Sequence, residues 1–373
     1  MGVDVQYVGW ICSYVPEELI HAAGLRPYRI SPEYSSNSGN CRSLPANFCP
    51  LVKKIVESFE KGEYEFLSGY VIANSCNAMS HLYNVLVNQS HRDQFVYFLD
   101  VPRKNDDLSV KYFENQLMDL FVYLNNTTKP SIESNIRENQ LLYSENTDSL
   151  LDSIKVYRET QEKLAKINYG IHNLEMDFLN LTNKLAREPR EQINTWLDHK
   201  INDKNIQNYN KNKSLLILTG AMINQDLAKI LQNVSNYHIL PETCQGLKYL
   251  QKDGLLSKTL DKLNQSGEQE LLELIAFTYL NKPPCTRLLG EASNASRKTR
   301  IYELKKLFDY HDVKGVIHHD LGFCDISNYD FLMINDICDD YDIPLLRLNS
   351  ELGKTELGQL QTRLEAFCEM KVL

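Results

Sequence analysis

Three of the nine cysteines stand where strands are expected to end or helices to begin. Cys49 lies in "ANFCPLVKK", Cys76 in "VIANSCNAMSHLYN" and Cys324 in "HHDLGFCDISNYD". Pro50 favours a helix start after Cys49, because a proline at the first helical position loses no hydrogen bond. The unpaired N–H groups and the dipole of a helix N-terminus stabilise a thiolate. These three thiols are therefore candidate metal ligands.

The number of ligands limits the kind of metal site. A single free cysteine is more often a small buried hydrophobe, but three at strand ends in both halves of the chain favour a shared ligand. Three thiolates without a nearby fourth partner suit an iron–sulfur cubane in which one iron stays open. Zinc usually takes four ligands, and His318 and His319 are the candidates to complete such a set. The residue types alone leave both alternatives open.

The other cysteines form no recognisable motif. Nine is an odd number, no C-x2-C pair occurs, and the N-terminus "MGVDVQYVGWICSYVPEEL" lacks the pattern of an export signal. A disulfide framework, a zinc ribbon and a thioredoxin-type site are therefore not expected. For Cys12 two positions are considered, the crevice of the candidate ligands and a buried strand end, and the buried strand end is favoured. We assign three cysteines in helical or loop patterns to packing: Cys244, Cys338 and Cys368.

The elements that would position these residues alternate between strand and helix. In the first 130 residues "VQYVGWIC", "GYVIANS" and "FVYFLDVP" read as strands, and "VPEELIHAAGL" reads as a helix that stops at Gly24. From about residue 211 the strands "LLILTGAM", "YHILPE", "KGVIHHD" and "IPLLRLN" again alternate with helical patterns. Such alternation indicates parallel sheets with crossover helices.

Between these halves lie long charged helices, one of which Pro189 should end or kink. The predicted fold class is α/β, with two Rossmann-like parallel-sheet lobes and a helical insert or bridge between them. The predicted domains are an N-terminal α/β lobe over 1–130, a helical bridge over 131–210 and a C-terminal α/β lobe over 211–373. Ligands of open α/β sheets bind beyond the carboxyl ends of the strands, which is where the candidate cysteines fall.

Composition and charge exclude some classes of partner. The chain has 373 residues, 43% of them hydrophobic, and a formal net charge of -9. A negative net charge repels nucleic acid and acidic membrane surfaces. No window approaches the roughly 20 apolar residues that span a bilayer. The sequence therefore predicts a cytoplasmic protein with neither a nucleic acid nor a membrane as partner.

Several segments together resemble one known family, the 2-hydroxyacyl-CoA dehydratase and benzoyl-CoA reductase subunits. They are "GWICSYVPEELIHAAGLRPYRI", "NFCPLVKK", "VIANSCNAMSHLY", "KGVIHHDLGFCD" and "GQLQTRLEAF", in the family's order. The length resembles the smaller, beta-type dehydratase subunit. The resemblance implies two Rossmann-like lobes that hold a [4Fe-4S] cluster through three cysteines. Carried over by motif, these are Cys49, Cys76 and Cys324.

The resemblance also implies an activity and partners. Such dehydratases are lyases that receive one electron from a separate ATP-hydrolysing iron–sulfur activator protein. A ketyl radical of the acyl-CoA substrate then loses the 2-hydroxyl as water, and the product is an enoyl-CoA. The expected oligomer is a heterodimer with a homologous second subunit, or a homodimer. The "GKT" at 353–355 has Leu348 where a phosphate-binding loop needs its first glycine, so ATP hydrolysis is expected on another protein.

Two other functions are kept as alternatives. The first is an ATP-dependent low-potential reductase of the benzoyl-CoA reductase type or of the double-cubane [8Fe-9S] type. The segment "KGEYEFLSGY" lacks the extra cysteine of double-cubane relatives. The segment "PPCTRLLG" does resemble those relatives, which makes Cys285 an additional candidate beside the cluster. The second is a non-catalytic binding or partner protein on the same scaffold. The candidates for catalysis are His318, His319 and Ser13. Arg287 is a candidate for binding a phosphate or an acidic group.

Overall fold

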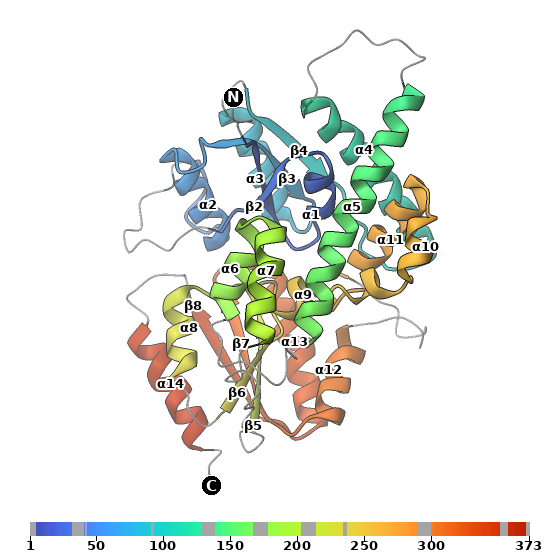
Figure 1. The fold of residues 1–373 in the computed structure, drawn as a ribbon. Helices are drawn as coiled ribbons and strands as arrows, with labels where there is room; N and C mark the ends of the chain where they lie inside the picture. The colour runs from blue at the N-terminus through green and yellow to red at the C-terminus, as the bar shows by residue number, and fades with distance from the viewer. Residues whose placement is uncertain are drawn as a thin grey trace.

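The chain folds into two four-stranded parallel sheets flanked by helices (Figure 1). This is a computed structural model, and it describes residues 5–31, 41, 43–90, 93–128, 139–166, 178–202, 214–233, 237–288, 300–350 and 357–370. The mixed α/β class and the two Rossmann-like lobes predicted from the sequence are confirmed. No helix in these ranges is long and apolar enough to cross a membrane.

Lobe 1 is built around the first sheet, whose strand order is β2-β1-β3-β4. Its strands are β1 (Tyr7–Ile11), β2 (Arg26–Arg29), β3 (Leu67–Ala73) and β4 (Phe95–Leu99). Its crossover helices are α1 (Glu17–Ala22), α2 (Pro50–Glu60) and α3 (Asn77–Gln89). Sequence patterning did not predict β2, because "RPYR" is short and polar and contains a proline, which is tolerated at the edge of a sheet.

Lobe 2 repeats this arrangement with the order β6-β5-β7-β8. Its strands are β5 (Ser214–Gly220), β6 (Tyr237–Pro241), β7 (Val313–Leu321) and β8 (Leu345–Ser350). Its helices are α8 (Gln225–Gln232), α12 (Arg300–Tyr310), α13 (Asp325–Asp340) and α14 (Leu357–Glu369). The two sheets therefore correspond strand by strand, with β1, β2, β3 and β4 equivalent to β5, β6, β7 and β8.

The remaining helices lie against lobe 1 and the junction. They are α4 (Asp107–Thr128), α5 (Asn139–Lys166), α6 (Phe178–Arg187), α7 (Arg190–Ile201), α9 (Leu247–Leu250), the 3-10 helix η1 (Asp253–Leu256), α10 (Leu260–Asn264) and α11 (Glu268–Asn281). Pro189 separates α6 from α7, as predicted. Figure 1 shows α5 running from beside lobe 1 down to the level of α9 and α13.

One part of the chain crosses between the lobes in an unexpected way. Helix α11 follows the second strand of lobe 2 in sequence but packs against α4 and α5. Its apolar residues share one buried cluster with Val8 and Trp10 of β1 and with Phe113 of α4. The division of the sequence at 130 and 210 stays a prediction, and in space the core of lobe 1 is completed by a later segment.

Candidate functional site

The three candidate cysteines each occupy the N-cap of a helix. Cys49 precedes α2, Cys76 precedes α3 and Cys324 precedes α13, and none of the three side chains makes a capping hydrogen bond. Pro50 is the first residue of α2, as predicted. All three residues line one cavity of about 870 Å³ that is formed by both lobes. Segments separated by more than 240 positions in the sequence thus meet at the carboxyl ends of the two sheets.

The three thiols have unequal acidities. A hydrogen bond with Cys49 lowers the pKa of Cys324 to about 6, and the same bond, together with burial, raises the pKa of Cys49. Burial raises the pKa of Cys76 to about 11. One thiolate is therefore available at neutral pH before a cation binds. The others would be deprotonated on binding, because a coordinating cation favours the thiolate.

A second group of thiols lies beside the first. Cys285 and Cys244 hydrogen-bond to one another, which lowers the pKa of Cys285 to about 5 and raises that of Cys244. Cys12 lies close enough to both Cys244 and Cys76 to raise their pKa values electrostatically. Cys285 acts in the same way on Cys324. Six of the nine cysteines thus form a continuous set at the junction of the lobes.

The correspondence between the sheets explains this convergence. Cys76 and Cys324 follow the equivalent strands β3 and β7, while Cys49 and Cys244 follow the equivalent strands β2 and β6. Cys12 follows β1 directly and has a φ of 79°. The sequence assigns Cys244 to packing, and for Cys12 it favours a buried strand end over the crevice. The signal that could have identified them is their place after strands equivalent to those that precede the other cysteines.

The packing prediction holds for two other cysteines. Cys338 is buried in the core of lobe 2, and Cys368 packs against the second cluster of that lobe. Cys41 packs against the α2 and α3 side of lobe 1 and does not line the large cavity. All nine cysteines are free thiols.

The arrangement does not build a mononuclear site. Within the described ranges, no three His, Cys, Asp or Glu side chains converge closely enough to hold a single metal ion. A zinc ion requires its ligands around one centre, so the described residues give the zinc alternative no support. A cubane has a different requirement, because each of its cysteines ligates a different iron. The Cys49 and Cys324 sulfurs, which hydrogen-bond to one another here, would have to separate around such a cluster. The donor set of Cys49, Cys76 and Cys324 around one cavity fits such a cluster.

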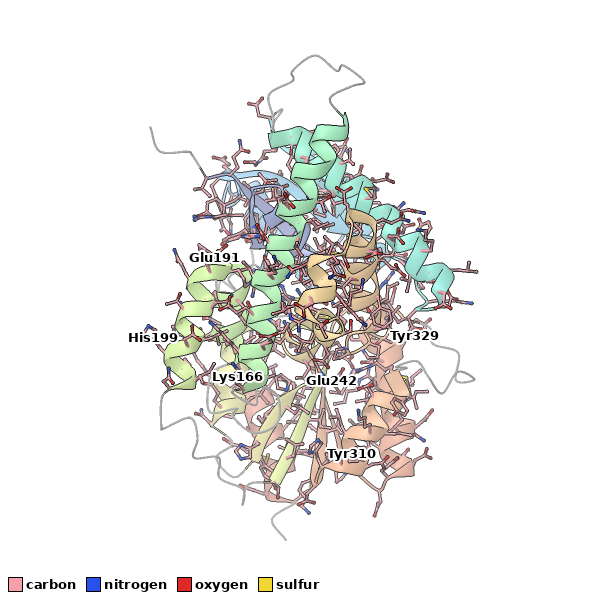
Figure 2. All side chains as sticks on the ribbon, turned by 45° about the vertical axis from the view of Figure 1, so that its right-hand side comes forward. Lys166, Glu191, His199, Glu242, Tyr310 and Tyr329 are labelled. Atoms are coloured by element: carbon pink, nitrogen blue, oxygen red, sulfur yellow. The ribbon has the colours of Figure 1, made fainter. Side chains whose placement is uncertain are left out.

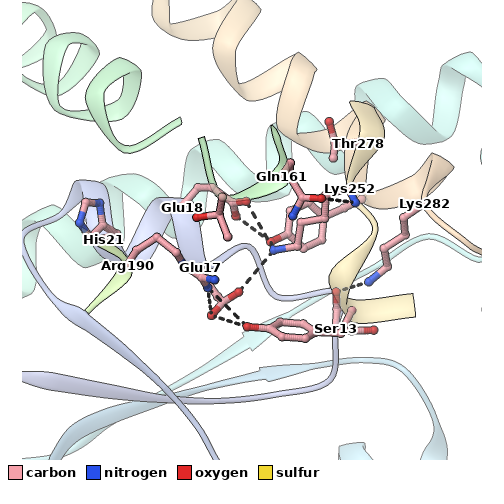
Figure 3. A network of polar contacts seen from close by, with 12 residues as sticks. Ser13, Glu17, Glu18, His21, Gln161, Arg190, Lys252, Thr278 and Lys282 are labelled. Carbon is pink, nitrogen blue, oxygen red and sulfur yellow. Dashed lines mark hydrogen bonds and ion pairs between the residues drawn. The ribbon is translucent and has the colours of Figure 1, made fainter. Parts of the chain in front are cut away.

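A buried ionic network holds the helix that follows Cys12 (Figure 3). Glu17 and Glu18 of α1 are 1% and 0% exposed. Glu17 accepts hydrogen bonds from Arg190 Nη2 at 3.1 Å and pairs with Lys252 Nζ at 3.3 Å. Tyr279 donates to Glu18 at 2.6 Å and accepts from Lys252 at 2.7 Å. Side chains of α1, α7, α11 and the α9–η1 loop are thereby tied together.

The catalytic candidate Ser13 lies at the edge of this network. Ser13 is 3% exposed, and its backbone carbonyl accepts a hydrogen bond from Lys282 Nζ. The Lys282 ammonium also lies 4.3 Å from the centre of the Tyr14 ring, and burial lowers the pKa of Lys282 to about 7. Ser13 is not among the residues that line the large cavity. Its contact with substrate stays a prediction.

The two candidate histidines are also placed in the interior. His318 and His319 are both 0% exposed, and neither lines the large cavity. His318 Nε2 lies 3.0 Å from Asp320 Oδ1 and 3.0 Å from the carbonyl oxygen of Ser327, so this nitrogen carries the proton. His319 Nε2 lies 2.9 Å from Ser350 Oγ. His318 thus fastens the first turn of α13, which begins after Cys324, and a proton-donor role for either ring stays a prediction.

His319 gives the protein an expected pH dependence. Burial lowers the pKa of His319 to about 4, whereas the ring has an ordinary pKa of 6.5. The unfolded chain therefore takes up a proton at a pH where the folded protein does not. The free energy of unfolding is expected to fall by on the order of 3 kcal/mol between about pH 6.5 and pH 4 through this residue alone.

The measurement is urea unfolding at pH 7 and at pH 4 for the wild type and for His319→Gln. Glutamine keeps a donor for Ser350 but does not titrate. The variant should lose about 3 kcal/mol less than the wild type over this range. Equal losses in the two proteins would show that His319 is not the group responsible.

Arg287, the candidate for binding an anion, is held by backbone carbonyl groups. Its guanidinium donates to four backbone carbonyls at the carboxyl ends of β3 and β4, at distances from 2.7 to 3.2 Å. The acceptors are the carbonyl oxygens of Asn74, Ser75, Val101 and Pro102. Arg287 is 5% exposed, so these bonds lie away from water. Four of the five guanidinium N–H groups are occupied by the loops that follow β3 and β4, so Arg287 positions both loops. It also lines the large cavity, and its binding of an anion stays a prediction.

Replacing Arg287 should therefore destabilise the protein whether or not the positive charge is kept. Arg287→Lys is expected to lower the free energy of unfolding by about 2–4 kcal/mol, because an ammonium cannot reach four carbonyls and leaves buried acceptors unpaired. The control is Arg363→Lys, because the exposed Arg363 donates to only one backbone carbonyl, at 2.7 Å. This substitution should change the free energy of unfolding by less than about 1 kcal/mol. Similar values for both variants in urea unfolding would contradict this role for Arg287.

The fold and the thiols define a class of protein: a two-lobed α/β protein with cysteines from both sheets around a cavity at the lobe junction. The chain belongs to the family described as 2-hydroxyglutaryl-CoA dehydratase, D-component, whose model matches residues 12–371. It is 23% identical to the (R)-phenyllactyl-CoA dehydratase beta subunit of Clostridium sporogenes, over 97% of this chain and 91% of the relative. It is 20% identical to a benzoyl-CoA reductase subunit of Thauera aromatica, over 97% of this chain and 90% of the relative.

Proposed function

We propose that this chain is the iron–sulfur subunit of a 2-hydroxyacyl-CoA dehydratase-like enzyme, with Cys49, Cys76 and Cys324 as ligands of a [4Fe-4S] cluster. The observation that carries the proposal is the meeting of these three cysteines around one cavity. The family membership supports the acyl-CoA substrate class. A cytoplasmic location is part of the proposal, since nine free thiols suit a reducing compartment.

Residues of this chain would position the three cysteine ligands and stabilise their negative charge. Each ligand stands at a helix N-terminus, where unpaired backbone N–H groups favour negative charge on sulfur. Arg287 and His318 fasten the loops that follow β3 and β7, so Cys76 and Cys324 are held at a defined separation. The cavity that these cysteines line has a volume typical of ligand sites, so it has room for a small molecule.

The chemistry that the cluster would supply is transfer of single electrons at low potential. Elimination of water from a 2-hydroxyacyl-CoA needs such an electron, because the 3-hydrogen of the saturated acyl thioester is not acidic enough for an ordinary base to remove. In the proposed reaction one electron added to the thioester carbonyl gives a ketyl radical of the substrate. Loss of the 2-hydroxyl as water and of a 3-proton, followed by return of the electron, leaves the enoyl-CoA.

Two protein partners belong to the proposal. Both relatives are named as subunits, one of them as a beta subunit, which supports function within a multi-subunit complex, here with a homologous second subunit or a second copy. An ATP-hydrolysing iron–sulfur activator would deliver the electron. A separate activator is expected because residues 348–355 lack the first glycine of a phosphate-binding loop; the "GKT" at 353–355 lies outside the described residues.

A second candidate function is favoured by the additional thiols. Cys12, Cys244 and Cys285 lie beside the first set, which supports the alternative of a double-cubane [8Fe-9S] cluster in an ATP-dependent low-potential reductase. The absence of a cysteine from "KGEYEFLSGY" still favours the single cubane. The two candidates differ in the amount of iron that the chain binds.

The test is iron and acid-labile sulfide analysis of the anaerobically purified full chain, together with its visible absorption spectrum. About four irons per chain would support the single cubane, and about eight would support the double cubane. A colourless protein that takes up neither iron nor sulfide on anaerobic reconstitution would overturn both candidates and favour a non-catalytic partner. Incubation with a 2-hydroxyacyl-CoA, the activator and ATP then distinguishes a lyase, which yields enoyl-CoA and water, from a reductase.

A further inference from the structure

Lys282 is a buried cation that has no carboxylate partner among the described residues. It is the C-cap residue of α11 and is 2% exposed. Its ammonium donates to the backbone carbonyl of Ser13 (Figure 3) and lies 4.3 Å and 5.3 Å from the centres of the Tyr14 and Tyr279 rings. A carbonyl and two aromatic faces attract a cation but do not neutralise it. A buried charge is costly unless a group of opposite sign stands near it.

The buried ionic network beside Lys282 does not supply this opposite charge. Its carboxylates are those of Glu17 and Glu18, and its cations are those of Arg190 and Lys252. Two negative charges are thus matched by two positive ones, and the network is neutral as a whole. Lys282 therefore stands beside a balanced network as an additional positive charge.

The groups of opposite sign that face Lys282 are thiols. Burial is the largest influence on the pKa of Lys282 and lowers it, whereas negative charge on Cys12, Cys244 and Cys285 raises it. Cys12 and Cys285 in turn lie close to two of the proposed cluster ligands. The charge of Lys282 is therefore directed at the set of thiols at the lobe junction.

Two buried arginines add positive charge around the same thiols. Arg29 is 3% exposed and donates to the carbonyl of Cys244 at 2.9 Å. Its guanidinium lies over the Trp10 and Tyr249 rings. Arg287 is 5% exposed and is held by the four backbone carbonyls described above. In the described part of the chain neither arginine has a carboxylate partner, so this part of the interior has an excess of positive charge that a negatively charged centre at the thiols would neutralise.

We propose that Lys282 is the buried counter-cation of the negative charge at the thiols and stabilises the electron that the proposed cluster gains on reduction. The inference rests on the function proposed above and adds to it a residue that sets the reduction potential. In this step one electron passes from a one-electron donor to the cluster, and no covalent bond is made or broken. A positive charge raises the reduction potential of a nearby centre, and it acts most strongly where water is excluded.

The same residue should make the potential depend on pH. Burial lowers the pKa of Lys282 to about 7, and the added negative charge of a reduced centre would raise it. Above about pH 7, reduction should therefore be accompanied by uptake of a proton on Lys282. A tenfold change in proton concentration corresponds to about 59 mV for a one-electron couple, so the potential should fall by up to this amount per pH unit. At lower pH Lys282 is already charged, and the potential should be level.

The test is a redox titration of the anaerobically reconstituted full chain at several pH values, followed by the electron paramagnetic resonance signal of the reduced cluster. Lys282→Met removes the charge and should lower the potential to a value that does not change with pH. Lys282→Arg keeps a charge that does not titrate, so its potential should be independent of pH and equal to the wild-type value at low pH. The wild-type potential should pass from the arginine value at low pH to the methionine value at high pH.

Lys166→Met is the matched control, because it removes the same charge from the surface. Lys166 is exposed, and Figure 2 shows it at the lower end of α5, so water and salt screen its charge. This substitution should leave the potential and its pH dependence unchanged.

Iron content separates two kinds of failure. A wild-type chain that takes up no iron would overturn the proposed function, and this inference with it. If Lys282→Met binds about four irons per chain and has the wild-type potential at every pH, this inference alone is overturned. Should Lys282→Met lose its iron, Lys282→Arg decides the question, since a pH dependence equal to that of the wild type would contradict the role of Lys282.

Discussion

Replacing Cys76 by serine is expected to remove the bound iron and the visible absorbance of the anaerobically purified protein without unfolding it. Cys76 occupies the N-cap of α3 and makes no capping hydrogen bond. Serine is among the best N-cap residues, so Cys76→Ser should keep or improve the stability of the helix while removing the thiolate. The same reasoning applies to Cys49 and Cys324 at their own N-caps. Each variant should fall from about four irons per chain to fewer than about one.

The control for these variants is Cys368→Ser. Cys368 lies on α14, is partly exposed and packs against a cluster of lobe 2 away from the cavity. It should keep the iron content and the spectrum of the wild type. Retention of all iron by any of the three N-cap variants would remove that cysteine from the ligand set. Unfolding of a variant, seen by circular dichroism, would contradict the capping argument separately.

The additional thiols give these experiments a second use. If the chain holds a single cubane, then Cys12→Ser, Cys244→Ser and Cys285→Ser should leave about four irons per chain. If it holds a double cubane, the same substitutions should lower the count from about eight. The two groups of variants together therefore assign the cluster type from the chain itself, independently of any substrate.

The second large effect is expected at Arg300, the first residue of α12. Its guanidinium donates to both carboxylate oxygens of Asp330 at 2.8 Å, to Thr219 at 2.7 Å and to Glu242 at 2.5 Å. Arg300, Asp330 and Glu242 are all at most 5% exposed. Burial by itself would raise the pKa of Asp330, but the charge of Arg300 outweighs it and holds that pKa well below its usual range. Arg300 thus holds α12 and α13 against the carboxyl ends of β5 and β6 in lobe 2.

Arg300→Met is expected to lower the free energy of unfolding at pH 7 by about 3–5 kcal/mol, because it leaves two carboxylates buried with their main partner removed. The matched control on the same helix is Lys305→Met, which removes a largely exposed pair with Asp340 at 3.3 Å. Lys305→Met should lower the free energy of unfolding by less than about 1 kcal/mol. Urea unfolding at pH 7 measures both.

A double-mutant cycle identifies the reason for the loss. Arg300→Met with Asp330→Leu replaces one buried pair by apolar side chains, so the double variant should lose less than the sum of the two single variants. Strict additivity would mean that the two residues do not stabilise the fold through one another. The result bears on function too, since both helices line the cavity that holds Cys324.

Much of the fold could be predicted from local patterns. Strand β1 is a largely apolar run, and β3 and β7 contain shorter apolar stretches. Pro16, Gly24 and Pro189 mark helix ends, so local patterning is sufficient for these elements. The edge strand β2 was missed, since its pairing with β1 comes from main-chain hydrogen bonds that its polar side chains do not indicate.

The sequence by itself determined the α/β class, the two lobes and the position of Cys49, Cys76 and Cys324 at helix starts, because these depend on residues close together in the chain. Only the tertiary structure decided that Cys12, Cys244 and Cys285 lie beside them, and that Arg287 holds a backbone loop. The buried pairing of Glu17 and Glu18 with Lys252 was decided in the same way. The contacts of Arg287 with backbone join residues 185 to 213 positions apart, and Glu17 and Lys252 are 235 positions apart. Their geometry follows from how two equivalent sheets and α11 pack against one another.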